Sequence, residues 1–509
     1  MDILHHRFIR TAKKFLEKEA IIDRTTGKRL TYKRALIGGL ILAGKISGYK
    51  EKQLGVMMPT SAGGFLSTIA VLMAGKIPAM INYSTDAEKN SRYAQTQCGF
   101  ETIITSRALL EKIGCPVVPG MVCIEDIISR ITVFDKIVAG VKAIRSPEAI
   151  IRSLARTEVG DTAVILFTSG SEKAPKGVQL SHGNLSANLR DILEALPLSS
   201  DERIMSILPL FHVFGHTINF WLPMTTGMTA ITYANPLDYK TVPEIIRQEK
   251  ATIIAATPIF FAGYLRESHH GDFASLHLAM AGADKTPDGL RQGFREKHGI
   301  ELLEGYGTTE TSPAISFNSP TANRPGSIGK VLPGVEVKIA DLLTDVPLAV
   351  GTEGRILVRG DLVMKGYLDP EQTAAVINDG WYDTGDMGLL DEDGYLWHKG
   401  RLKRFVKIGA EMVSLVKVEA ALEELLPEGI DCCVVDIPDE TRGAAIVVVL
   451  TAEIDKEQML EQLKKVLSHL EIPKNFMVIE EIPKMGSGKA DFRSVTRIVR
   501  EKYATDSSE

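Results

Sequence analysis

The stretch TSGSEKAPKG, at residues 168–177, places small hydroxyl side chains and glycines directly after the apolar run AVILF at 163–167. Such a run predicts a buried strand. Glycine and serine at its end let backbone N–H groups and hydroxyls approach a phosphate without a bulky Cβ in the way. The stretch is not a Walker loop, because Pro175 stands five positions after Gly170, where that motif has its second glycine. Phosphate binding is therefore the first hypothesis, and an ordinary capped strand-to-helix turn is the alternative.

Four further segments follow this loop. They are YGTTE at 306–310, WYDTGD at 381–386, GRLKRFVKIGAEMVS at 400–414 and IPKMGSGKADFR at 482–493. In this order they resemble the motifs of the adenylate-forming superfamily, which includes acyl-CoA synthetases, luciferases and nonribosomal adenylation domains. Taken alone, Tyr306 suits a core aromatic, Asp386 a turn residue and Lys489 a solvated turn. The shared order of the segments favours the functional interpretation over these structural ones.

The resemblance implies a role for each matching residue. Tyr306 is expected beside adenine and Asp386 on the ribose hydroxyls. Thr309 is expected at the α-phosphate, Glu310 on magnesium and Lys489 as the catalytic lysine. Further nucleotide contacts are expected from Thr168, Ser169, Gly170, Ser171, Lys176, Gly282, Ala283, Gly307, Thr308 and Arg401.

These residue types suit the reaction that the resemblance implies, in which a carboxylate is joined to ATP. That step brings two anions together and builds negative charge on phosphorus, so the site needs cations and hydrogen-bond donors. Lys489 supplies a cation, and Glu310 supplies a hard oxygen for Mg²⁺. A non-catalytic protein that binds nucleotide or acyl-adenylate is an alternative from another class. The presence of Lys489, Glu310 and Asp386 together argues against it.

The sequence indicates the acyl-binding half of the site less strongly than the nucleotide-binding half. His212, in PLFHVFG at 209–215, resembles the family histidine beside the carboxylate. After it, Phe214, Ile218, Trp221 and Leu222 fall at helical spacing and are candidates for the acyl pocket, although a buried core helix shows the same stripe. An apolar pocket selects an aliphatic chain at about 0.8 kcal/mol per buried CH₂. No Asp or Arg partner for an amino acid stands out, so we expect a fatty acid.

Several segments, including AGADK at 281–285 and MGSGKADF at 485–492, are most similar to one branch of the superfamily. This branch is the acyl-[acyl carrier protein] synthetase half of the bacterial 2-acylglycerophosphoethanolamine acyltransferase/synthetase family. None of the eleven histidines has an aspartate five residues later, so the HxxxxD acyltransferase motif of that family is absent from the sequence. The resemblance implies transfer of the acyl group from acyl-AMP to the phosphopantetheine thiol of acyl carrier protein.

The acceptor stays open between acyl carrier protein and coenzyme A, and an acyl-AMP ligase is a further alternative. Arg493, Arg497 and Arg500 fall on one face of an expected C-terminal helix. That face suits an acidic carrier protein or the phosphates of coenzyme A, and a solvated charged face is the structural alternative. Lys173 replaces a loop glycine of the family, and Ala410 replaces the glycine beside its thiol tunnel. An added methyl at Ala410 would narrow that tunnel.

Composition fits a two-domain enzyme of 509 residues with 44% hydrophobic and 24% charged residues. The net charge of −5 gives no reason to expect nucleic acid as a partner. Five cysteines without metal-ligand spacing indicate a reducing compartment. The N-terminus predicts an amphipathic helix rather than a signal peptide, and the apolar segment 63–75 is too short to span a bilayer. We expect a cytoplasmic protein, with peripheral contact at the inner membrane left open.

Alternating strand-like and helical runs predict an α/β large N-terminal domain of largely parallel sheets wrapped by helices. The strand-like runs are at 55–58, 163–167, 204–208, 253–256 and 276–281. We expect this adenylation domain at residues 1–402, with a small β-barrel at about 326–400. Residues 403–509 predict a smaller α+β domain with strands at 433–437 and 445–450 and a helix at 456–469. By resemblance this domain is mobile, and Lys403 is its hinge.

Overall fold

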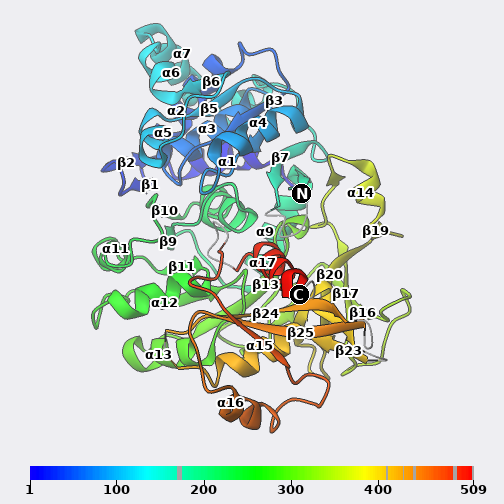
Figure 1. Cartoon of the computed structure of the whole chain (residues 1–509). Coiled ribbons are helices and arrows are strands. Elements are labelled where there is room, and N and C mark those ends of the chain that lie inside the picture. Colours follow the sequence, from blue (N-terminus) through cyan, green and yellow to red (C-terminus); the bar gives the residue numbers. More distant parts are fainter. Residues whose placement is uncertain (169–174, 409–410, 428, 440–442, 485–489, 507–509) are drawn as a thin grey trace.

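The computed structural model describes residues 1–168, 175–408, 411–427, 429–439, 443–484 and 490–506. Two large sheets with helices packed on them form most of the chain, and a smaller antiparallel sheet and a C-terminal unit complete it (Figure 1). The N-terminal lobe, blue to cyan, lies at the top of this view, and the C-terminal unit, orange to red, lies in the lower half.

The first large sheet has seven strands. Their spatial order is β18 (Gly366–Tyr367), β8 (Gly177–Ser181), β7 (Thr162–Phe167), β4 (Ile77–Met80), β3 (Gln53–Val56), β5 (Ile103–Thr105) and β6 (Met121–Cys123). The strands from β7 to β6 run parallel, whereas β7 and β8 are antiparallel neighbours. Residues 163–167 lie in β7 and are largely buried, as predicted. The loop after β7 joins two strands, which rules out the strand-to-helix turn.

The second large sheet has nine strands. Their order is β15 (Lys330–Val331), β14 (Ala314–Phe317), β13 (Leu302–Gly307), β12 (Leu278–Ala281), β11 (Ile253–Ala256), β9 (Arg203–Ser206), β10 (Thr229–Thr232), β1 (Glu19–Asp23) and β2 (Lys28–Thr31). The six strands from β13 to β1 are parallel, and the outer strands β2, β14 and β15 are antiparallel. This arrangement confirms the predicted fold class of a large α/β unit.

Helices pack on both large sheets and between them. In the N-terminal half they are α1 (Leu4–Lys14), α2 (Tyr32–Ile46), α3 (Ala62–Met73), α4 (Ala87–Cys98), α5 (Arg107–Ile113), α6 (Ile124–Ser129), α7 (Val133–Ile144), α8 (Pro147–Arg152) and α9 (His182–Ala195). Those that follow are the π-helix η1 (Gly215–Trp221), α10 (Leu222–Thr226), α11 (Thr241–Glu249), α12 (Pro258–Glu267), α13 (Asp288–His298) and α14 (Pro370–Ala374). The expected N-terminal amphipathic helix is α1.

Helix α3 lies in the main core. Ser61 caps it by accepting a hydrogen bond from the Gly64 backbone N–H at 3.1 Å. Its Phe65 ring packs 4.6 Å from the ring of Phe220, and both side chains are fully buried. Because neighbours surround most of the helix, its sequence is apolar on nearly every side. Within the part of the chain that the structure describes, no helix combines the length and apolarity needed to cross a membrane.

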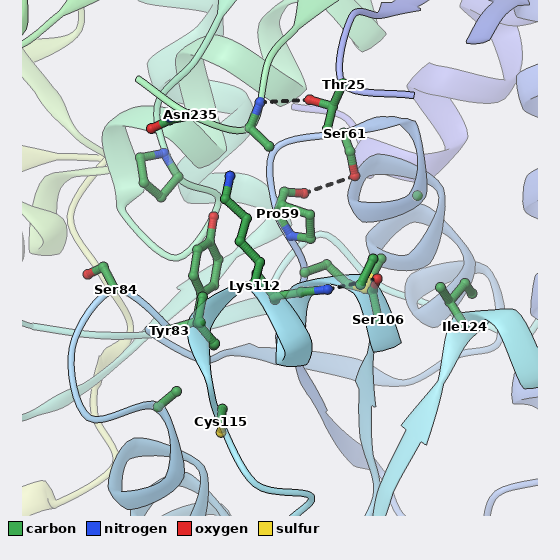
Figure 2. Close-up of a pocket in the computed structure, with 18 of the residues that line it drawn as sticks. Thr25, Pro59, Ser61, Tyr83, Ser84, Ser106, Lys112, Cys115, Ile124 and Asn235 are labelled. Carbon is green, nitrogen blue, oxygen red and sulfur yellow. Dashed lines mark hydrogen bonds between the residues drawn. The ribbon is translucent and has the colours of Figure 1, made fainter. Parts of the chain in front are cut away.

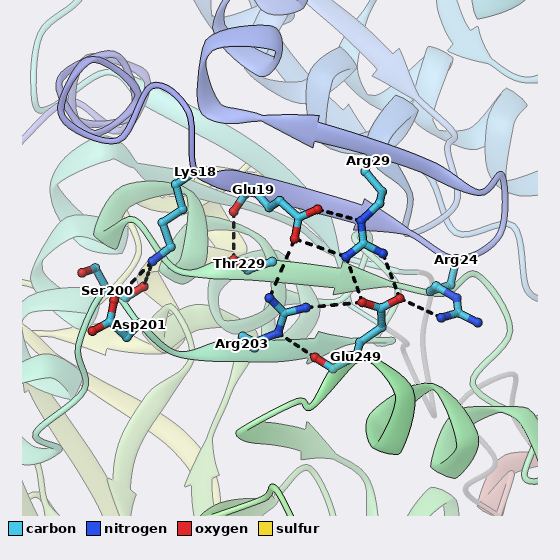
Figure 3. Close-up of polar contacts among 9 residues, drawn as sticks. All are labelled: Lys18, Glu19, Arg24, Arg29, Ser200, Asp201, Arg203, Thr229 and Glu249. Carbon is cyan, nitrogen blue, oxygen red and sulfur yellow. Dashed lines mark hydrogen bonds and ion pairs between the residues drawn. The ribbon is translucent and has the colours of Figure 1, made fainter.

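A buried carboxylate ties the edge of the second sheet together (Figure 3). Glu249 ends α11 and is only 8% exposed. It accepts hydrogen bonds from Arg24 at 2.7 Å, from Arg29 at 3.0 and 3.1 Å and from Arg203 at 3.3 Å. Burial opposes the charge on Glu249, but the bonds from Arg29 and Arg24 outweigh it and hold its pKa below the ordinary value. The carboxylate thereby joins α11 to β2, β9 and the end of β1.

The third sheet lies in the region of the predicted small β-barrel, and its strands are antiparallel. It consists of β16 (Val335–Ala340), β17 (Gly354–Gly360), β20 (Trp381–Leu390), β19 (Ile377–Asn378) and β21 (Leu396–Arg401). Among the described strands, β16 pairs only with β17 and β19 only with β20. The predicted small β-barrel is therefore a half-barrel, because these two strands lie at open edges.

The C-terminal unit contains strands and helices, as expected. They are β22 (Phe405–Ile408), β23 (Glu411–Ser414), α15 (Leu415–Glu423), β24 (Cys432–Asp439), β25 (Gly443–Leu450), α16 (Lys456–Leu463), β26 (Asn475–Val478) and α17 (Phe492–Asp506). Arg404 joins three of them, because it donates to the Val434 carbonyl at 2.7 Å and to Glu419 at 2.8 Å and lies 3.8 Å from the Phe492 ring centroid. The predicted helix 456–469 is too long, since α16 ends at Leu463 and Glu471 accepts from the Ser468 N–H in a separate turn.

Candidate active site

Two residues close the base of the phosphate loop. The Thr168 N–H donates to the Lys176 carbonyl at 3.0 Å, and the Lys176 N–H donates to the Thr168 hydroxyl oxygen at 3.1 Å. The adjoining Pro175 carbonyl accepts a hydrogen bond from Tyr93 at 2.6 Å. These bonds fix both ends of the loop at the carboxyl end of β7. Ser169, Gly170, Ser171 and Lys173 lie outside the described residues.

A chain of contacts leads from this loop to the predicted magnesium ligand. The Lys176 ammonium lies 4.4 Å from the ring centroid of Tyr367. The Tyr367 hydroxyl donates to the Glu310 carboxylate at 2.7 Å. Burial, followed by the neighbouring Glu310 charge, raises the pKa of Tyr367 and keeps its proton in place. Glu310 follows β13 in the 3₁₀ turn Thr309–Thr311 and is 8% exposed.

Tyr306 and Asp386 form a second unit. The Tyr306 hydroxyl donates to one Asp386 oxygen at 2.6 Å, and His398 and Arg401 each lie 3.6 Å from the other. Burial opposes ionisation of Asp386, but His398, Arg401 and Tyr306 stabilise the charge and hold its pKa below the ordinary value. The predicted adenine and ribose residues are therefore direct neighbours, and Asp386 is an anion at neutral pH.

Tyr382 is close to residues of both units. It belongs to β20, the strand that also carries Asp386. Its pKa is raised by burial first and then by the charge of Glu310, and Tyr367 and Tyr306 also act on it. The Glu310 and Asp386 units thus belong to one site.

Three small residues beside this site leave little room for a larger side chain. Gly307 has no room for a Cβ, which would collide with the carbonyl of Pro313. A Cβ on Gly282 would lie 3.3 Å from the Phe214 ring. Ala283 has φ of 71°, a left-handed conformation that costs a residue with a Cβ. At these three positions a larger side chain has little room beside Tyr306.

Thr308 and Thr309 enter the site from the same turn. The Thr308 N–H donates to the Thr311 hydroxyl oxygen at 3.0 Å, so Thr308 is held at the start of the turn. Thr309 is half-buried. Their place beside Glu310 follows directly from the sequence YGTTE.

A buried ion pair supports the turn at Ala283. Arg291, from α13, forms a short ion pair with Glu304 of β13. Glu304 also accepts from the Thr286 N–H at 2.9 Å. The turn is thereby fixed to the strand that carries Tyr306.

The predicted acyl residues divide into two groups. The His212 and Phe211 rings lie 4.6 Å apart, and Phe214 and Ile218 are half-buried. Trp221 and Leu222, in contrast, lie in the main core, where the Trp221 indole donates to His216 at 3.1 Å. Trp221 and Leu222 are therefore packed among core residues, and their place in an acyl pocket stays a prediction. The segment is a π-helix, and its wider turn changes which side chains share a face.

The C-terminal residues are described only in part. Lys489 and Ala410 lie outside the described residues. Lys484 and Ala490 form an antiparallel bridge at the two ends of the lysine loop. Lys403 lies in the 3₁₀ turn Leu402–Arg404, between β21 of the third sheet and β22. The arginines predicted to face the acceptor lie on the exposed side of α17. They are Arg493, Arg497 and Arg500.

A cleft of about 1610 Å³ lies next to this site, at the carboxyl ends of both large sheets (Figure 2). None of the residues predicted to bind nucleotide lines it. Tyr83 and Pro209 do line it, and the Tyr83 ring contacts Phe211 at 5.0 Å, beside His212. Lys112, Ser106 and Ile124 also line it. No sequence motif marks this cleft, because its walls are built mainly from helices and loops that are distant in the sequence.

Comparison with known families identifies the chain's relatives. A model described as AMP-binding enzyme matches residues 8–368, and one described as AMP-binding enzyme C-terminal domain matches residues 417–489. The chain belongs to the AMP-binding enzyme family.

Related AMP-binding enzymes match at modest identity. The long-chain-fatty-acid–CoA ligase of Bacillus subtilis (strain 168) is 34% identical over 347 residues, which are 65% of this chain and 60% of that ligase. The 4-coumarate-CoA ligase 1 of Narcissus pseudonarcissus is 28% identical over 96% of this chain and 92% of its own length. ATP-bound MatB from Rhodopseudomonas palustris superposes with a TM-score of 0.82 at 24% identity, covering 98% of this chain and 99% of MatB. That likeness establishes the AMP-binding enzyme fold.

Sequence reasoning missed several residues of the candidate site in this AMP-binding enzyme. Tyr367 is 57 positions from Glu310, and no motif marks it. His398 reaches Asp386 through the pairing of β20 with β21. A histidine in an alternating strand gives no signal until its partner strand is known.

Proposed function

We propose that the chain is an AMP-forming ligase that activates a fatty acid as acyl-AMP and passes the acyl group to a phosphopantetheine thiol. Family membership supports the activation of a carboxylate as acyl-AMP. Relatives named as CoA ligases support the transfer to a thiol. The observation that carries the proposal is the pairing of an ionised Asp386 with Tyr306, next to Glu310 and Tyr367. This arrangement offers a sugar-binding anion and a metal-binding carboxylate in one site.

Asp386 is the proposed ribose ligand. Its depressed pKa keeps both oxygens available as acceptors for paired hydroxyls at neutral pH. Tyr306 holds it in place and offers its ring to adenine. Ala283 and Gly282 supply backbone where a larger side chain would block the base.

Glu310 fits a magnesium ligand. It is buried, and its hydrogen bond from Tyr367 orients one oxygen. Among the described residues, no three His, Cys, Asp or Glu side chains are grouped to hold a metal unaided, which suits an ion that shares its ligands with phosphate and water. When bound, Mg²⁺ would neutralise phosphate charge. Lys176 and the loop that it closes would add further donors.

The proposed chemistry has two steps. A carboxylate oxygen attacks the α-phosphorus in line, the bond to the bridging oxygen breaks, and pyrophosphate leaves. Thr309 and Lys489 stabilise the added charge, and His212 lies beside the carboxylate. The thiol sulfur then attacks the acyl carbonyl after loss of its proton, and AMP leaves. We propose that the C-terminal domain turns about Lys403 between these steps.

The acceptor has two candidates, each with its own support. The exposed arginines of α17 favour the acidic surface of acyl carrier protein. The names of the relatives favour coenzyme A. Incubation with ATP, Mg²⁺, a mixed fatty-acid pool and either acceptor, followed by mass detection of the acylated thiol, distinguishes them. Acyl-carrier product is the expected result; acyl-CoA alone would assign coenzyme A, and neither product would refute thiol transfer.

A further inference from the structure

Helix α7 lies at the end of the N-terminal lobe farthest from α16 (Figure 1). It exposes a row of large apolar side chains. The side chains of Val133, Phe134, Ile137, Val141 and Ile144 are between 53% and 82% exposed. At 100° per residue these positions, with Val138, cover an arc of about 140° on the helix. We call this set the α7 apolar face.

An ordinary surface helix buries its large apolar side chains, whereas α7 exposes them. Its buried residues are the small Ala139 and Ala143, which face α2, while its larger apolar side chains point outward. An ion pair between Lys45 of α2 and Asp135, at 2.7 Å, fixes this orientation. Thr132 and Asp135 also form a capping box that fixes the start of the helix. The outward position of the apolar residues is therefore built into the packing.

Cations border the α7 apolar face. On the helical projection Lys136 and Lys142 flank the arc on opposite sides, and Arg130 and Arg145 stand at the two ends of the helix. The acidic residues of α6 and α7 are already engaged: Asp126 pairs with Arg107, Asp135 with Lys45, and Glu125 accepts from Ser106. An apolar arc bordered by lysines is the pattern of a helix that lies in a membrane interface.

We propose that the α7 apolar face docks on a lipid bilayer whose headgroups are anionic. Charge complementarity selects this partner, because the cations on both flanks match phosphate headgroups at the depth reached by an interfacial helix. A second copy of the chain suits the surface less well. Two facing copies of α7 would bring together Lys136, Lys142 and Arg145 of each molecule without acidic partners.

The large cleft begins near the α7 apolar face and leads toward the candidate site. Ile128, at the end of α6, is 51% exposed and also lines the cleft. The cleft extends from there to Tyr83 and Pro209, beside the loop of His212. An apolar molecule that leaves the bilayer near α6 has a continuous path toward that loop. This last step alone rests on the proposed function; the docking does not.

Vesicle co-sedimentation of the full chain tests the docking directly. We expect binding to vesicles of phosphatidylglycerol and phosphatidylcholine, at least tenfold weaker binding to pure phosphatidylcholine, and loss of binding with rising salt. Phe134→Ser with Ile137→Ser should weaken binding to the mixed vesicles at least tenfold. Lys136→Gln with Lys142→Gln should remove most of the preference for phosphatidylglycerol. The control, Leu343→Ser with Val346→Ser, changes side chains that are 93% and 61% exposed elsewhere and should bind like the wild type.

Two results would overturn the proposal. One is vesicle binding that is absent or is unchanged by the α7 substitutions. The other is a concentration-dependent dimer, seen by sedimentation velocity, that the Phe134 and Ile137 substitutions abolish while vesicle binding persists. Circular dichroism of each variant confirms that the fold is retained, and pyrophosphate release without vesicles reports separately on the proposed reaction.

Discussion

Asp386 shows how single residues set the chemistry of this site. A carboxylate that is 4% exposed would ordinarily bind a proton, because burial disfavours its charge. Tyr306, His398 and Arg401 reverse that preference. The ionised acceptor is therefore a product of three strands, β13, β20 and β21, and not of the WYDTGD sequence alone.

Tyr367 provides a sharp test of the Glu310 side of the site. Tyr367→Phe removes the hydroxyl that donates to Glu310 and keeps the ring beside Lys176. A hydrogen bond to a charged group is worth about 1.5–3 kcal/mol. Loss of that energy should raise the apparent KM for Mg²⁺, measured by pyrophosphate release, roughly tenfold or more. Tyr395→Phe, whose ring packs under Arg324, is the matched control, and equal effects of the two substitutions would contradict the role of Tyr367.

At the scale of elements, Glu249 ties α11 to the edge of the second sheet. Glu249→Gln should lower the free energy of unfolding by about 2 kcal/mol, because it leaves Arg24, Arg29 and Arg203 without their shared anion. Glu244→Gln, on the exposed side of the same helix, is the control and should change stability little. Urea denaturation measures both, and equal stability of the two variants would be the contrary result.

The same carboxylate predicts a pH dependence of stability. The pKa of Glu249 is lower in the folded state than in the unfolded chain. Its contribution is therefore complete above the unfolded pKa of about 4.3 and is lost as the pH falls through the folded value. The stability difference between wild type and Glu249→Gln should shrink below about pH 4. A difference that grows on acidification would contradict this assignment.

The elements that the sequence predicts best are those with a strong local pattern. The strand 253–256 coincides with β11, and the run 163–167 lies within β7. The π-helix η1 was not predictable in this way, because an apolar stripe does not report the width of a helical turn. The Glu310–Tyr367 contact and the large cleft depend on how distant segments of the chain meet. Local spacing therefore gave the motifs, and tertiary packing decided which residues around them share a site.

At the scale of the whole molecule, the proposed reaction requires an acceptor to dock near the C-terminal unit. Changing Arg493, Arg497 and Arg500 to Gln should raise the apparent KM for carrier protein and leave that for ATP unchanged, because these side chains are exposed on α17. Lys464→Gln with Lys465→Gln, on exposed positions after α16, removes charge elsewhere and is the control. Steady-state kinetics with carrier protein as the varied substrate would decide the matter, and an unchanged KM would exclude α17 as the docking surface.

The most direct test is pyrophosphate release from ATP and Mg²⁺ across a series of fatty acids, for the wild type, Lys489→Ala and Lys484→Ala. Lys484 pairs with Asp431 at 2.7 Å and serves as the matched control. We predict release only when a fatty acid is present, slowed by a factor of about 100 to 1,000 in Lys489→Ala, as for loss of one preorganised charge-stabilising donor, and nearly unchanged in Lys484→Ala. No release with any carboxylate, or release by Lys489→Ala at the wild-type rate, would contradict the account.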